Sequence, residues 1–165
     1  MLETVTRRFA DRHAAGRELA ERLRSLAIEE PIVLGLARGG VPVAYEVAQA
    51  LGAPLDVLVV RKIGAPGNPE YGIGAIAEGD ARALLNQEAL QGLLVSVEEL
   101  NAAVARERTE VKARVQRYRG ARAPVEVKGH TAIVVDDGLA TGGTARAALR
   151  AVRARGCGSS GVTGE

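Results

Sequence analysis

Aromatic residues are scarce in this chain of 165 residues, which has three Tyr, one Phe and no Trp. Nucleic-acid-binding surfaces commonly combine aromatic side chains with a basic stripe. The charge pattern disfavours such a surface too, because 22 basic residues are balanced by 20 acidic ones and the two signs alternate along the helical stretches. We therefore expect no nucleic acid among the partners.

Cysteine and long apolar runs are also lacking. The single cysteine, Cys157, excludes a disulfide framework and a cysteine-based zinc site. No apolar run approaches the roughly 20 residues that a membrane helix needs. Charged residues stand near the start of the chain, where a signal peptide would have its apolar core. We expect a cytoplasmic protein without a membrane partner.

Hydrophobic residues make up 47% of the chain, which is typical of a globular domain. Short apolar runs predict buried strands at residues 32–36, 55–60 and 131–135, and periodic patterns predict helices at residues 6–27, 41–51, 88–119 and 144–155. A strand, a helix and a second strand within about thirty residues are typical of a βαβ unit. We predict an α/β fold with a mostly parallel sheet flanked by helices, and a helical insertion at about residues 86–120.

Two segments lack such patterns. Residues 61–80 are rich in Gly and Pro and predict a long loop, in which residues 73–77 could pair with residues 82–85 as a short hairpin. Residues 157–165 form a Gly/Ser tail without a core pattern, which is either the end of a truncated chain or non-native sequence. The predicted single domain therefore covers residues 1–156.

Other nucleotide and metal motifs carry little weight. Glycine-rich matches to the dinucleotide fingerprint at residues 156–161 and 72–77 lack the preceding strand and following helix that it needs. No Walker motif is present, and His13 and His130 stand in unrelated segments. A plain nucleotide-binding module and a histidine-based site are both disfavoured.

The strongest motif spans residues 132–144, where an apolar strand leads into two acids and a loop rich in Gly and Thr. Open α/β sheets bind ligands at this end of a strand, and the N-terminus of the following helix favours an anion. Acids suit sugar hydroxyls, so a phosphate cradle beside them describes a ribose 5-phosphate site. The alternative is a simple acid-capped helix with Asp137 as the cap. We favour that alternative for the acid pair alone, but not for all thirteen residues.

This motif resembles the PRPP-binding motif of type I phosphoribosyltransferases (PRPP is 5-phosphoribosyl 1-pyrophosphate). The resemblance implies that Asp136 and Asp137 hold the ribose hydroxyls, with Asp137 counted among the catalytic residues. It implies Mg²⁺ as cofactor, carried by PRPP, with the two acids as further candidate ligands. The residues implied for the 5-phosphate are Ala140, Thr141, Gly142, Gly143 and Thr144.

Two earlier segments extend the resemblance. Residues 37–40 follow the first predicted strand, where the family has its pyrophosphate loop, often with a non-proline cis peptide. Lys62 follows the second, where family members present a basic residue. The implied pyrophosphate ligands are Arg38, Gly39, Gly40 and Lys62, and Arg38 and Lys62 are also implied to be catalytic. The stretch from residue 61 to 80 resembles the flexible catalytic loop, and Glu70 within it is either catalytic or a plain surface residue.

The function implied is Mg²⁺-dependent transfer of the 5-phosphoribosyl group from PRPP to a nitrogenous base, with release of pyrophosphate. The alternative is a PRPP-binding regulator or sensor without turnover. The acceptor base is not specified, although Ala140 stands where purine-salvage members that use 6-oxopurines usually have an Asp. Both a monomer and a homodimer are compatible with the sequence. One departure from the family is that the pattern stops at Gly156, before the strand expected to follow the PRPP helix.

Overall fold

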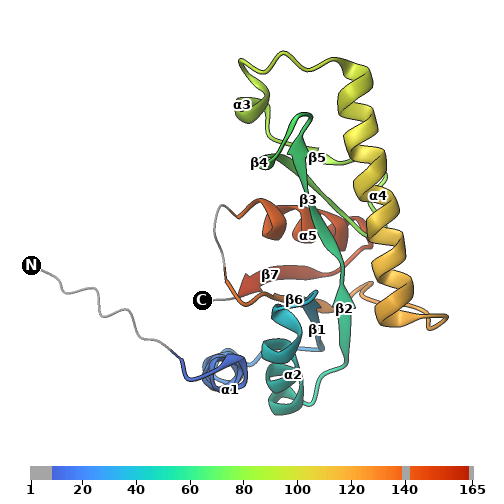
Figure 1. Cartoon of the computed structure of the whole chain (residues 1–165). Helices are drawn as coiled ribbons and strands as arrows, with labels where there is room; N and C mark the ends of the chain where they lie inside the picture. The colour runs from blue at the N-terminus through green and yellow to red at the C-terminus, as the bar shows by residue number, and fades with distance from the viewer. Residues whose placement is uncertain (1–8, 139–141, 164–165) are drawn as a thin grey trace, which may run out of the picture.

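The computed structural model describes residues 9–138 and 142–163, and its α/β architecture confirms the predicted fold class. In chain order the elements are α1 (Arg12–Arg24), β1 (Pro31–Leu36), α2 (Gly40–Leu51), β2 (Leu55–Leu58), β3 (Val60–Ala65), β4 (Asn68–Ala77), β5 (Leu84–Leu85), α3 (Gln87–Leu90), α4 (Val97–Arg119), β6 (Thr131–Val135), α5 (Gly143–Ala154) and β7 (Ser159–Thr163). Figure 1 shows α1 and α2 below a parallel sheet, with β3, β4 and β5 above α5.

The parallel sheet has the strand order β2-β1-β6-β7. Strands β1 and β6 are central and buried on both faces, which explains their continuous apolar sequences. Val33 and Ile133 pack on one face with α1 and α2, whereas Leu34 and Val134 pack on the other face with α5. The carboxyl ends of β1 and β6 therefore lie side by side at one edge, where the loops after them meet.

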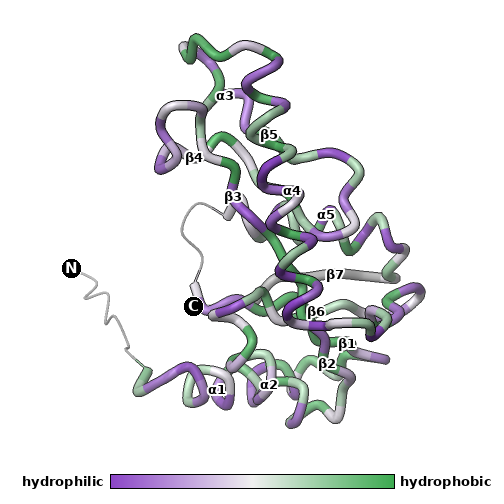
Figure 2. Tube along the Cα trace, turned by 45° about the vertical axis from the view of Figure 1, so that its right-hand side comes forward, coloured by the Kyte–Doolittle hydropathy of each residue, from purple (hydrophilic) through white to green (hydrophobic). Residues whose placement is uncertain are grey.

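The antiparallel sheet has the order β3-β4-β5 and continues the chain beyond β2. Ile63, Ile73 and Ile76 are fully buried in a cluster that includes Ala103 and Val111 of α4. Most other residues of α4 remain at least partly exposed to solvent. Along α1, hydrophilic and hydrophobic colours likewise alternate in Figure 2, as expected for a helix that covers a core on one side only.

A buried arginine joins the end of α4 to both sheets. The Arg119 guanidinium donates to Glu78, at 2.8 and 3.1 Å, to Asp56 of β2, at 3.2 Å, and to the Val57 carbonyl, at 2.6 Å. Burial alone would lower the pKa of Arg119, but the hydrogen bonds and charges of Glu78 and Asp56 outweigh burial and raise it. Asp56, the acid that interrupts the apolar run of β2, is thus explained by its ion pair with Arg119 of α4.

The prediction of a loop at residues 61–80 is wrong for most of that segment. Residues 60–65 and 68–77 form the antiparallel pair β3 and β4, with Lys62 opposite Ala75. The first half of β4 is exposed and rich in turn-forming residues, so no alternating pattern marks it, and backbone hydrogen bonds with β3 form the strand. The alternative hairpin is confirmed in part, because β5 pairs with β4 at Leu84 and Leu85.

Further boundaries differ from the predictions. The strand predicted at residues 55–60 is divided between β2 of the parallel sheet and β3 of the antiparallel sheet. The helix predicted at residues 88–119 is divided into α3 and α4, because Gly92 has a φ of +82° and Ser96 begins a new helix with a capping box. The prediction of a tail without core structure at residues 157–165 is wrong for residues 159–163. These residues form β7, which pairs with β6 in parallel. Ser and Gly have little preference for strands, so pairing with the sheet decides the conformation there.

Candidate functional site

The two acids of the motif lie at the carboxyl end of β6, against the loop that follows β1. A Cβ added to Gly39 would overlap the Asp137 carboxylate, and one added to Gly40 would overlap the Val135 carbonyl oxygen. Only glycines allow the two loops to approach this closely. The structure therefore brings together the predicted pyrophosphate loop and the predicted ribose acids, which are almost 100 residues apart in the sequence.

The loop after β1 also contains the cis peptide bond that the resemblance implies, between Ala37 and Arg38. The Arg38 side chain is exposed at the same edge of the sheet. The loop thus borders the acid pair through Gly39, and the exposed Arg38 is the residue next to that glycine in the chain.

The acid pair sits in a partly buried environment. Burial, together with the adjacent carboxylate of Asp137, raises the pKa of Asp136, while the Asp137 N–H, which donates to Asp136 Oδ1 at 2.9 Å, and the Lys62 charge act in the opposite direction. Of the groups that act on Asp136, Lys62 is the one that belongs to the antiparallel sheet, and its positive charge favours the ionised carboxylate. Sugar hydroxyl donors and cations would both relieve the repulsion between two neighbouring carboxylates.

A cavity of about 640 Å³ extends from the start of α5 to the antiparallel sheet. Lys62 of β3 and Glu70 of β4 line one part of it, and Gly143 and Thr144 of the predicted phosphate loop line another. Gly142 precedes α5 with a φ of +73°, a conformation that favours glycine. Ala140 and Thr141, also predicted to bind the 5-phosphate, lie outside the described residues.

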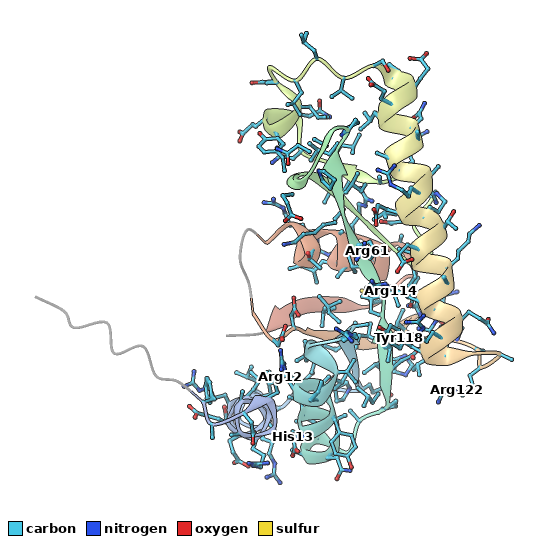
Figure 3. The ribbon with its side chains drawn as sticks, viewed as in Figure 1. Arg12, His13, Arg61, Arg114, Tyr118 and Arg122 are labelled. Carbon is cyan, nitrogen blue, oxygen red and sulfur yellow. The ribbon has the colours of Figure 1, made fainter. Side chains whose placement is uncertain are left out.

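Lys62 and its neighbour Arg61 have different surroundings. Arg61 Nε donates to Glu107 Oε2 of α4 at 3.0 Å, and Figure 3 shows its side chain between β3 and α4. Lys62 lines the cavity that reaches α5. Of these two adjacent basic residues, Lys62 is therefore the one that faces the start of α5.

Two basic residues near the site were missed from the sequence. Arg12, the first residue of α1, donates to Asp137 Oδ2 from Nε at 2.8 Å and from Nη2 at 2.6 Å. Arg146 of α5 lines the cavity together with Lys62 and Glu70. Arg146 stands two positions after Thr144 in the same helix, which is a usable signal, but nothing in the sequence links Arg12 with an acid 125 residues away.

The donors present suit Mg²⁺ only in part. Asp136 and Asp137 offer hard carboxylate oxygens, but no group of three or more His, Cys, Asp or Glu side chains that could hold a metal occurs within residues 9–138 and 142–163. Magnesium in proteins commonly uses one or two carboxylates and takes its other ligands from phosphates and water. The acid pair thus fits an ion that arrives with a phosphorylated substrate. Among the same residues, none of the helices has the length and apolar composition to cross a membrane.

The chain belongs to the phosphoribosyl transferase domain family, whose model matches residues 8–161. It is 47% identical over 148 residues to a "Putative phosphoribosyl transferase" of Mycobacterium tuberculosis, an alignment that covers 90% of this chain and 33% of that protein. The chain thus spans about a third of the length of this relative. It is 31% identical over 119 residues to the "Bifunctional protein PyrR" of Chloroflexus aurantiacus, covering 71% of this chain and 59% of that protein.

Solved structures share the fold. The crystal structure of TT1426 from Thermus thermophilus has a TM-score of 0.78 and 46% sequence identity, over 96% of this chain and 74% of that one. A purine phosphoribosyltransferase from Pyrococcus horikoshii has a TM-score of 0.53 and 18% identity, over 93% of this chain and 70% of that one. At that identity the second likeness establishes the fold alone.

Proposed function

We propose that this domain transfers the 5-phosphoribosyl group from PRPP to a nitrogenous base, with Mg²⁺ bound to PRPP, and releases pyrophosphate. The observation that carries the proposal is the contact between Gly39 and the Asp137 carboxylate at the carboxyl edge of the parallel sheet. That contact joins a loop suited to pyrophosphate to an acid pair suited to ribose hydroxyls. Membership of the phosphoribosyl transferase domain family supports the same chemistry.

Each group would then have a defined task. Asp136 and Asp137 accept hydrogen bonds from the ribose hydroxyls, and the N-terminus of α5 holds the 5-phosphate. As the bond from the ribose carbon to pyrophosphate breaks, negative charge grows on the leaving group beside Arg38, Lys62 and the backbone of Gly39. Groups already in place for that charge stabilise the transition state most. Mg²⁺, when bound, would neutralise part of the pyrophosphate charge.

The acceptor would occupy the cavity between α5 and the antiparallel sheet. Its volume of about 640 Å³ lies within the range of small-molecule sites. Leu84 and Leu85 supply apolar wall, while Glu70 and Arg146 supply groups that could orient a base by hydrogen bonds. The identity of that base is left to experiment, with 6-oxopurines expected to be poor acceptors because residue 140 is Ala.

The test is a binding measurement followed by a turnover measurement. Mg²⁺·PRPP should raise the melting temperature of the wild-type protein, and the double variant Asp136→Asn/Asp137→Asn should lose most of that rise. Pyrophosphate release is then measured across a panel of bases. A double variant that binds PRPP as tightly as the wild type would refute the ribose assignment, and binding without turnover on any base would favour the sensor.

A further inference from the structure

The Asp137 carboxylate is held from two sides. Gly39 of the loop after β1 lies directly against it, and both Nε and Nη2 of Arg12 donate to its Oδ2 atom. Neither of these donors uses Oδ1. Both hydrogen bonds from Arg12 thus hold the carboxylate through Oδ2.

Arg12 is itself placed firmly at the start of α1. The Asp11 side chain caps the helix by accepting from the Ala14 N–H at 2.7 Å, and His13 Nδ1 lies 2.8 Å from Glu46 Oε1 of α2. These contacts fix both neighbours of Arg12. Figure 3 shows the Arg12 side chain extending from α1 toward the carboxyl end of β6.

The contact made by Arg12 differs from two of the ion pairs further along α1. Arg22 pairs with Glu18 and Arg24 pairs with Glu21, one turn away on the same helix, where such pairs add little to stability. Arg12 instead reaches across 125 residues to an acid with a proposed ligand role. Its side chain is 58% exposed, so replacing it leaves no buried charge behind in the core.

We propose that Arg12 is a positioning residue for Asp137, which makes α1 part of the ribose-recognition apparatus of this domain. Arg12 orients the carboxylate so that Oδ1 meets a ribose hydroxyl. The inference rests on the proposed function, because it takes the acid pair as the ribose site. It assigns Arg12 no contact with the substrate.

The experiment measures the dissociation constants of ribose 5-phosphate and of Mg²⁺·PRPP by calorimetry for Arg12→Ala, Arg12→Lys and the control Arg22→Ala. Arg12→Ala should weaken both ligands equally, by about tenfold, since it removes charge-assisted hydrogen bonds that orient the acid. Arg12→Lys should restore part of the affinity, because it keeps the charge without the planar pair of donors. Arg22→Ala should match the wild type, and melting temperatures without ligand should separate misfolding from lost positioning.

A double-mutant cycle with Asp137→Asn gives the sharper readout. If Arg12 acts through Asp137, then Arg12→Ala should cause little further loss of affinity in the Asp137→Asn background. Equal losses in both backgrounds, unchanged affinity in Arg12→Ala, or tighter binding would overturn the proposal. A loss for PRPP far larger than for ribose 5-phosphate would also overturn it, since Arg12 would then touch pyrophosphate itself. A wild-type protein that binds neither ligand would refute the proposed function together with this role.

Discussion

The parallel and antiparallel sheets differ in how their strands are buried. Strands β1 and β6 are covered by helices on both faces, so their buried residues, 32–36 and 132–135, are all apolar. The first half of β4, by contrast, is exposed, and α4 contacts the adjoining β3 through an ion pair as well as apolar contacts. In the proposed function the parallel sheet holds PRPP at its edge and the antiparallel sheet forms a wall of the acceptor cavity.

This division fits the demands of the two substrates. A ribose phosphate has the same geometry whichever base accepts it, so a close-packed frame suits its ligands. The acceptor site must discriminate between bases, and exposed strands can change their side chains without disturbing a core. In the proposed function, the step common to all acceptors and the choice of acceptor would thus belong to separate sheets.

The largest effect should come from Arg119, which joins the two sheets. Arg119→Ala leaves Glu78 and Asp56 buried without their partner, and breaking a buried pair of this kind costs about 3–5 kcal/mol of unfolding free energy. Urea denaturation measures the loss. Arg114→Ala is the matched control, because Arg114 pairs with Glu110 on the partly exposed side of the same helix. Equal, small losses in both variants would show that the network does not hold the sheets together.

The second largest effect should come from Lys62 of β3, and its neighbour Arg61 should behave differently. Lys62→Ala should lower turnover by about a hundredfold or more, because it removes the cation proposed to face the leaving group, while ribose 5-phosphate affinity stays near the wild-type value. Arg61→Ala is the neighbouring control, whose partner is Glu107 on α4. Steady-state rates beside calorimetric affinities decide the matter. A parallel loss of rate and of ribose 5-phosphate affinity in Lys62→Ala would mean that the residue maintains the fold.

A smaller effect is expected at Glu70, whose role the sequence leaves open. The structure places Glu70 beside the cavity with Lys62. Glu70→Gln should raise the KM for the acceptor by about tenfold, a difference of about 1.4 kcal/mol, and leave PRPP affinity unchanged. Glu29→Gln serves as the control, since Glu29 is an exposed residue just before β1, at the opposite end of that strand from the site. No change in any acceptor constant would leave Glu70 as a surface residue.

The sequence predicts the parallel sheet far better than the antiparallel one. The apolar runs of β1 and β6 and the acid pair between β6 and α5 are local signals, because burial on both faces and a ligand at the strand end leave marks in consecutive residues. The fold class and the family follow from them. The position of residues 37–40 beside the acids is not a local signal. It follows only from the rule that neighbouring parallel strands end at the same edge of a sheet.

The missed features depend on contacts that are distant in sequence. Strand β7 takes its conformation from pairing with β6, and the first half of β4 takes it from β3, so their own residues show no pattern. The pairing of Arg12 with Asp137 likewise depends on how α1 packs beside the sheet. Such features follow from the assembled fold, and a reading of separate segments cannot supply them.

The smallest effect concerns the start of α4, which belongs to the exposed part of the molecule. Ser96 accepts from the Glu99 N–H at 3.1 Å, and Glu99 accepts from the Ser96 N–H at 2.8 Å. Ser96→Ala removes one half of this capping box and should cost about 1 kcal/mol of unfolding free energy. PRPP affinity should not change, because Ser96 lies at the opposite end of α4 from Arg119, the residue that joins this helix to the parallel sheet. A marked loss of PRPP affinity would instead show that the two sheets act as one binding unit.

Glu99, the acidic residue of the same capping box, should make the unfolding free energy depend on pH in a definite direction. Hydrogen bonds from the Ser96 backbone and then from its side chain lower the pKa of Glu99 in the folded protein. A carboxyl whose folded pKa is depressed adds stability above its unfolded pKa and loses it as the pH falls through the folded value. The stability difference between wild type and Glu99→Gln should therefore be present at neutral pH and shrink on acidification below the unfolded pKa. Urea titrations at several pH values check this, and a difference that persists unchanged at low pH would mean that the charge of Glu99 contributes nothing to the cap.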